Sequence, residues 1–105
     1  MKDSIDVNVL ATGLQFPEGP VALEDGSVLV AEIRSGLIKR VWPNGTVTTH
    51  ADCKGGPNGL AIGPDGDLYV CNNGGNHYPP DHFPATGPAI DYSAAYIQRV
   101  NMRPG

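Results

Sequence analysis

The chain has 105 residues, of which 40% are apolar, and it carries a formal net charge of −4. This length suits one small domain, and the acidic balance argues against a nucleic-acid surface. No apolar stretch approaches the roughly 20 residues that a bilayer-spanning helix needs, and the N-terminus shows no signal-peptide pattern. We therefore expect a cytoplasmic protein that contacts neither nucleic acid nor membrane.

Glycine and proline are frequent, with 14 and 10 residues, and they are spread along the chain. Turn residues at short intervals favour many short strands over disorder. Asp25-Gly26 and Asn44-Gly45 are typical turn pairs, since such residues tolerate positive φ angles. In chain order, alternating apolar and β-branched residues predict strands over 6–11, 19–23, 27–33, 37–42 and 46–51.

The same order of elements returns 40 residues later. Residues 7–33 align with residues 47–73 without a gap, and seven positions are identical. Strands are accordingly predicted over 59–62, 67–71 and 97–100. A period of about 40–45 residues built from short strands is typical of four-stranded propeller blades. The sequence therefore predicts an all-β fold, a partial β-propeller of about two four-stranded antiparallel blades.

The repeat also predicts the domain organisation. Residues 6–12 would be the outer strand of the closing blade of an intact ring. Residues 17–52 form the first blade, and residues 57–105 form a second, incomplete blade. Since propellers typically need 4–8 blades to close, we expect an N-terminal fragment whose partners are the missing C-terminal blades.

A loop insertion is expected at residues 74–92. The third strand of the second copy lies 59 residues after the third strand of the first copy, whereas the earlier elements lie 40 residues apart. The difference leaves 19 extra residues. The insertion is rich in proline and contains His77 and His82. Long loops on compact β scaffolds are often lids or binding loops, and a plain surface excursion is the alternative.

The residue that opens each inner strand is expected at the mouth of the central channel. Glu18 and Asn58 occupy this position in the two copies. Their side-chain oxygens suit a hard divalent cation such as Ca²⁺ or Mg²⁺. The alternatives are a solvated carboxylate for Glu18 and an ordinary turn residue for Asn58. Glu32 and Asn72, at the far end of the second strand, are expected to be merely solvated.

The remaining reactive side chains give weaker signals. Cys53 and Cys71 lack metal-ligand spacing and are expected to be free thiols, with a single disulfide as the alternative. His50 belongs to the polar fourth strand and is expected to face solvent.

Three stretches, Phe16–Val21, Gly56–Gly66 and Leu68–Gly75, resemble the gluconolactonase / regucalcin-like family of six-bladed propellers, also called the senescence marker protein family. The resemblance implies a divalent metal, Ca²⁺ or Zn²⁺, on the channel axis and hydrolysis of sugar lactones or related esters. Glu18 matches the family's metal-binding glutamate. For Asn58 the resemblance implies pocket lining in place of direct ligation.

Asn58, Asn73 and His77 are the candidate substrate-binding residues, and no catalytic residue is assigned. The family's other metal ligands, an Asn and an Asp, come from later blades. The resemblance therefore implies the N-terminal part of a metal-dependent lactonase that is inactive alone. The alternative is a non-catalytic propeller repeat module that binds a ligand or a protein.

Overall fold

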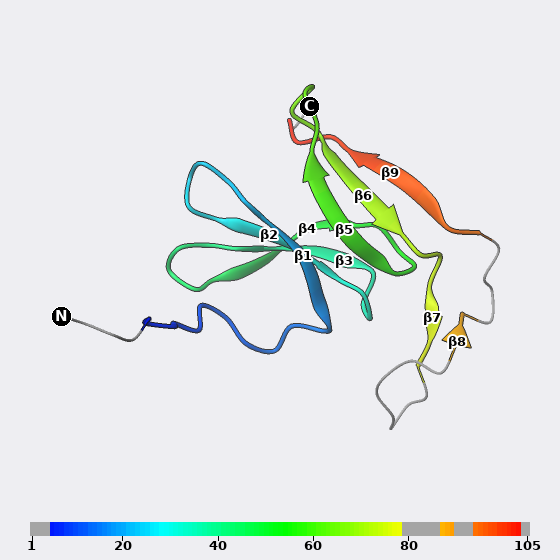
Figure 1. Ribbon diagram of the computed structural model, residues 1–105, viewed down its shortest axis with the longest axis horizontal. Helices are drawn as coiled ribbons and strands as arrows, with labels where there is room; N and C mark the ends of the chain where they lie inside the picture. Colours follow the sequence, from blue (N-terminus) through cyan, green and yellow to red (C-terminus); the bar gives the residue numbers. More distant parts are fainter. Residues whose placement is uncertain (1–4, 79–86, 90–93, 104–105) are drawn as a thin grey trace.

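The computed structural model describes residues 5–78, 87–89 and 94–103, and the fold is all-β. In these ranges the chain forms a four-stranded sheet, a three-stranded sheet and a short two-stranded hairpin (Figure 1). All paired strands are antiparallel. Nothing in the described ranges forms a helix capable of crossing a membrane. The predicted fold class is confirmed.

The first sheet has the order β1-β2-β3-β4. Its strands are β1 (Pro17–Ala22), β2 (Val28–Glu32), β3 (Leu37–Val41) and β4 (Val47–Asp52). The turn between β1 and β2 is closed by the Asp25 carboxylate, which accepts hydrogen bonds from the backbone N–H and the hydroxyl of Ser27. β1 begins two residues before the predicted strand because Pro17 already pairs with Glu32, and a β-bulge follows between Glu18 and Val21.

The second sheet repeats this order over three strands. They are β5 (Pro57–Ile62), β6 (Leu68–Asn72) and β9 (Tyr96–Val100), in the order β5-β6-β9. Pro57 pairs with Asn72 across an equivalent bulge, so the 40-residue repeat is kept in the backbone pairing. The hairpin of β7 (Asn76–His77) and β8 (Gly87–Pro88) lies within the predicted insertion. Within this insertion, residues 79–86 and 90–92 lie outside the described residues, and His82 is among them.

The core lies between the two sheets. β1 and β5 lie side by side, and β2 also contacts β5 (Figure 1). Buried side chains of the first sheet meet those of the second; the central ones are Leu29, Ala31, Ile38, Leu68 and Val70. Alternate residues of β2 and of β6 face this core, as expected for strands with a period of two. The arrangement is consistent with two successive propeller blades whose inner strands are neighbours.

The two inner strands come closest at Gly19. Its φ of 60° lies in the left-handed region, and a Cβ atom there would collide with the carbonyl oxygen of Asn58. Only glycine fits such an approach. Its repeat partner Gly59 has ordinary room, since the nearest atom to an added Cβ would be the Cys71 Cβ at 3.7 Å.

Residues 5–14 form no strand. Val9, Leu10 and Leu14 line a cavity on the face of the first sheet that is turned away from the second, although Val9 and Leu10 are still 77% and 58% exposed. A strand needs a hydrogen-bonded neighbour, and the described residues offer none to this segment. Its assignment as the outer strand of a closing blade, residues 6–12, stays a prediction.

Candidate functional site

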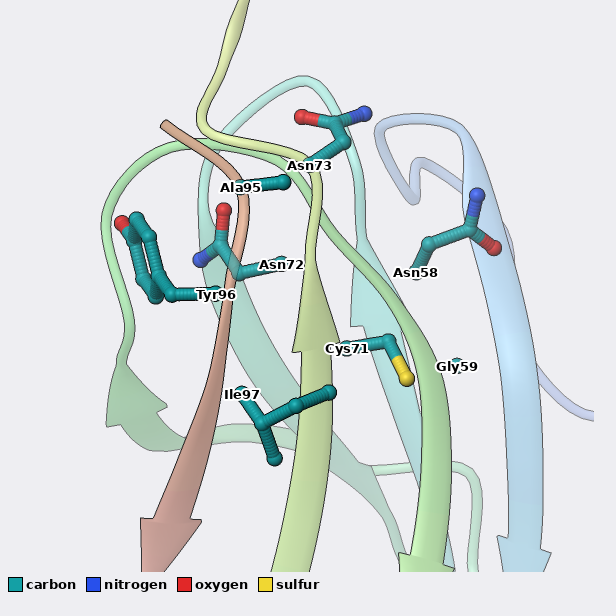
Figure 2. A pocket seen from close by; sticks show the side chains of 8 residues that line it. All are labelled: Asn58, Gly59, Cys71, Asn72, Asn73, Ala95, Tyr96 and Ile97. Carbon is teal, nitrogen blue, oxygen red and sulfur yellow. The ribbon is translucent and has the colours of Figure 1, made fainter. Parts of the chain in front are cut away.

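A pocket of about 530 Å³ opens beside the second sheet. Strands β5, β6 and β9 and the residues just before β9 supply its walls (Figure 2). The pocket combines amide, thiol, phenol and aliphatic groups. It is lined by Asn58, Gly59, Cys71, Asn72, Asn73, Ala95, Tyr96 and Ile97.

Two of the three predicted substrate-binding residues, Asn58 and Asn73, line this pocket together. Asn58 is exposed and projects from β5 on the side of β1, away from Asn72 and Tyr96 (Figure 2). Its backbone oxygen is the atom that approaches Gly19. The pocket therefore reaches the place where the two inner strands meet.

Asn73 is held by a local turn. Its N–H donates to the carbonyl of Gly56 at 2.9 Å, and its Oδ1 accepts from the N–H of Gly75 at 2.8 Å. A Cβ atom on Gly56 would overlap the Asn73 amide, so glycine at position 56 is required for this geometry. The hydrogen bond from Gly75 N–H to Asn73 Oδ1 makes a local Asx turn, which fixes the Asn73 side chain at the pocket rim.

Asn72 is a structural residue, and the prediction that it is merely solvated is wrong. Its side chain is 2% exposed. Oδ1 accepts from the N–H groups of Gly56 and Gly74, both at 2.9 Å, while Nδ2 donates to the Lys54 carbonyl at 2.8 Å and to Gln98 Oε1 at 3.0 Å. One amide therefore ties together three segments that the sequence pattern gives no reason to join.

Glu32, the repeat partner of Asn72, is likewise buried, at 3% exposure, and its prediction as a solvated residue is also wrong. Its carboxylate accepts from the N–H of Gln15 at 2.9 Å and from the hydroxyl of Ser35 at 2.6 Å. Burying a polar group is tolerated only when it is hydrogen-bonded, and this carboxylate is bonded through both oxygens.

The other two candidate site residues lie apart from the pocket. Glu18 is exposed near the start of β1, opposite Ala31 of β2. His77 is exposed in β7, opposite Gly87. The structure thus brings Asn58 and Asn73 together without Glu18 or His77 in the same pocket. Functional roles for all four residues stay predictions.

The oxygen donors near the starts of β1 and β5 fit only part of a cation site. Glu18 and Asn58 open neighbouring strands and offer oxygen donors, the type that hard cations prefer. Within residues 5–78, 87–89 and 94–103 no group of three or more His, Cys, Asp or Glu side chains is placed to hold a metal ion. Because Ca²⁺ takes about 6–8 oxygens, these two residues do not complete a site, and we derive no chemical step through a metal.

Sequence reasoning missed Cys71, Tyr96 and Ile97 as pocket residues. The repeat gives no signal for them in the sequence, because Cys71 corresponds to the small Ala31 and Ile97 to an identical Ile38. Both partners are fully buried in the first sheet, whereas Cys71 is exposed and Ile97 is 66% exposed.

Two further predictions concern reactive side chains. Cys53 and Cys71 are free, as predicted, and burial raises the pKa of the Cys53 thiol. His50 is half-buried, with Nε2 3.2 Å from the Met102 sulfur, so the prediction that it faces solvent is wrong. Desolvation lowers the pKa of His50, and the positive charge of Arg40 lowers it further.

Comparison with known proteins finds a gluconolactonase that is similar to part of this chain. The chain is 29% identical over 85 residues to a gluconolactonase of Zymomonas mobilis subsp. mobilis, and the similarity covers 68% of this chain. It covers 24% of the relative, so the chain spans about a quarter of that protein's length. No known protein-family profile matches the chain.

Proposed function

We propose that this chain forms the first two blades of a divalent-metal-dependent hydrolase that acts on sugar lactones or related esters. One observation carries the proposal: β1 and β5 lie side by side with Glu18 and Asn58 near their starts, as two inner strands around a shared channel would. The similarity to a gluconolactonase supports the same class of reaction.

In this proposal Glu18 contributes one carboxylate to a Ca²⁺ or Zn²⁺ site, and the other ligands come from blades outside this chain. The bound metal would supply a positive charge that polarises the lactone carbonyl. Asn58 and Asn73 line the pocket that receives the sugar, where their amides can exchange hydrogen bonds with hydroxyl groups. His77, on the exposed hairpin, would contact the substrate from outside that pocket.

Calcium titration of the protein completed by its further blades, with matched variants, tests the metal part. Glu18→Gln removes the charge but keeps the shape, and Glu24→Gln is the control because Glu24 is also exposed but follows β1 at its far end. We expect Glu18→Gln to weaken Ca²⁺ or Zn²⁺ binding at least about tenfold by calorimetry, and Glu24→Gln to leave it unchanged. Equal affinity in both variants would contradict the role of Glu18.

Gluconolactone hydrolysis tests the reaction itself. We expect measurable turnover only when the further blades complete the metal site, and loss of that turnover in Glu18→Gln. A completed protein that binds gluconolactone without hydrolysing it would refute the enzyme and favour the second candidate.

That second candidate is a non-catalytic binding propeller. The observation that favours it is the chemistry of the pocket, whose lining among the described residues has three amides and a phenol but no carboxylate or imidazole. Such a lining can bind a polar ligand without acid–base chemistry.

A further inference from the structure

Another cavity, of about 400 Å³, lies at the same end of the sheets as Glu18 and Asn58. Its walls include the turn between β2 and β3, the connection between β4 and β5, and the segment that follows β6. Because β1 is antiparallel to β2 and β5 is antiparallel to β6, these connections share one end with the starts of the two inner strands. Arg34 and Lys54 line this cavity, which is here called the basic cavity.

The charge of the basic cavity is opposite to that of the chain. The chain has 7 Lys and Arg residues against 11 Asp and Glu residues. Two of its cations nevertheless line this one cavity, and none of the described lining residues is an aspartate or a glutamate. Cations gathered in a concave site raise the local concentration of anions. The lining therefore favours a negatively charged ligand.

Arg34 is positioned by an aromatic ring. It follows β2 and is half-buried, and its guanidinium carbon lies 4.8 Å from the centroid of the Tyr78 ring. A guanidinium has five N–H donors in a fixed fork, which matches two oxygens of a carboxylate or a phosphate. Arg34 can therefore bind an anion while it keeps its contact with Tyr78.

Lys54 is positioned through its backbone. Its carbonyl accepts a hydrogen bond from the buried Asn72 amide at 2.8 Å, and its N–H donates to Asp52 Oδ1 at 3.1 Å. The side chain is 84% exposed, and its Nζ lies 3.8 Å from Asp52 Oδ2. An exposed ion pair at this separation is weak, so an anion in the basic cavity can compete for the ammonium group.

Tyr96 separates the basic cavity from the pocket of about 530 Å³, here called the amide pocket, because it lines both. Figure 2 shows its ring on the side away from Asn58. A Cβ atom added to Gly55 would lie 3.2 Å from the Tyr96 hydroxyl oxygen, so this hydroxyl lies beside the loop that carries Lys54. The phenol can donate a hydrogen bond to an anion bound there.

The turn after β6 also joins the two cavities. Asn72 and Asn73 line the amide pocket, and the next two residues, Gly74 and Gly75, line the basic cavity. Gly74 is the repeat partner of Arg34, so equivalent positions of the two sheets meet at this cavity. Because the two cavities follow each other along one turn, a single ligand can occupy both.

We propose that Arg34 and Lys54 bind the anionic group, a carboxylate or a phosphate, of a ligand whose uncharged part lies in the amide pocket. The basic cavity supplies charge and a forked donor, and the amide pocket supplies hydrogen bonds for hydroxyl groups. That the uncharged part is a sugar rests on the proposed function, whereas the anion site does not. The substrate class then narrows to lactones and esters of sugars that carry an anionic group.

Binding of three sugars tests the anion site. Calorimetry on the protein completed by its further blades compares glucose 6-phosphate, glucuronate and uncharged glucose. We expect at least one of the two anionic sugars to bind at least about tenfold more tightly than glucose, because its hydrogen bonds are charge-assisted. Added salt should reduce this difference. The tighter of the two anionic sugars identifies the group as a phosphate or a carboxylate.

Variants of the two cations test which groups bind the anion. Arg34→Gln and Lys54→Gln should each lower the affinity for the anionic sugar at least about fivefold and leave that for glucose unchanged. Arg34→Lys keeps the charge without the fork and should retain part of the preference. Arg99→Gln and Lys39→Gln are the controls, because they remove the same charge from strands outside the cavity and should change neither affinity.

Two outcomes overturn the proposal. One is that neither anionic sugar binds more tightly than glucose. The other is a preference for the anionic sugar that persists in both Arg34→Gln and Lys54→Gln, which would place the anion elsewhere. Failure of the proposed function is distinguishable, because a protein that prefers the anionic sugar through Arg34 but hydrolyses no lactone refutes the hydrolase and keeps the anion site.

Discussion

The two sheets share one backbone register but organise their loops with different chemistry. At the end of the second strand the first sheet has Glu32 and the second sheet has Asn72, and both pair with the proline that opens the inner strand. Glu32 receives hydrogen bonds only, from Gln15 and Ser35. Asn72 both receives and donates, because the segments around it present N–H groups as well as carbonyl oxygens. The strand-end residue is matched to its loop, while the pairing beneath it stays constant.

A second difference lies in the inner strands. Gly19 of β1 meets the backbone of β5, whereas at Gly59 of β5 an added Cβ would make only ordinary contacts, with Cys71. The same residue at the same repeat position therefore has two physical roles. In β1 it permits the sheets to approach, and in β5 the described chain puts nothing against it that requires glycine.

Substituting these two glycines gives the largest expected contrast. Gly19→Ala would place a methyl group on the Asn58 carbonyl at a positive φ angle, and we expect it to lower the free energy of unfolding by about 3–5 kcal/mol. Gly59→Ala should cost about 1 kcal/mol or less. Urea denaturation of both variants measures the contrast, and equal losses would refute the close approach of β1 and β5.

Asn72→Ala should have the next largest effect. It leaves the buried Gly56 N–H and the part-buried Lys54 carbonyl without their partner, which we expect to cost about 3 kcal/mol. Asn101→Ala is the control, because exposed Asn101 accepts one hydrogen bond, from the Arg103 N–H, and should cost about 0.5 kcal/mol. Thermal unfolding of the pair tests the prediction. Similar losses would show that the Asn72 network is not stabilising.

Glu32→Gln should be milder than loss of Asn72. Glutamine keeps one acceptor oxygen but turns an NH₂ group towards a donor, and we expect a cost of about 1–2 kcal/mol. Glu24→Gln, at an exposed turn, is the matched control and should stay within about 0.5 kcal/mol. A Glu32 variant as stable as the control would mean that the carboxylate contributes nothing through its two hydrogen bonds.

Much of the fold follows from the sequence because the information is local and repeated. β-Branched runs, Asn-Gly and Asp-Gly turns and the 40-residue period predict the seven strands of the two sheets within about two residues. The offset of 59 also identifies β9 across the insertion. These features depend on neighbours along the chain, which the sequence displays directly.

The site is less accessible to such reasoning because it depends on long-range contacts. Glu32 and Asn72 look like solvated strand ends, yet each is buried by a segment 16–18 residues away or by a turn it closes itself. His50 belongs to a polar strand but packs on Met102. Asn58 was predicted because it opens the inner strand of the second copy, and Asn73 because it lies in a stretch that resembles the family, whereas the contribution of Tyr96 depends on how β9 returns to the sheet.

The smallest expected effect is a pH dependence of stability that comes from His50, a residue of the first sheet. Burial holds the pKa of His50 below its ordinary 6.5, so the unfolded chain binds a proton more readily than the folded one. Stability is then fully present above pH 6.5 and falls as the pH drops from 6.5 towards the lowered pKa of the folded state. His50→Gln removes this titration, and its urea midpoint should vary less than that of the unaltered chain between about pH 7 and pH 5. Met102→Leu is the partner control, since it keeps the burial but not the sulfur contact and should retain the slope. A slope that persists in His50→Gln would place the titrating group elsewhere. The packing of β4 on the segment after β9 would then not be the cause of the lower stability in acid.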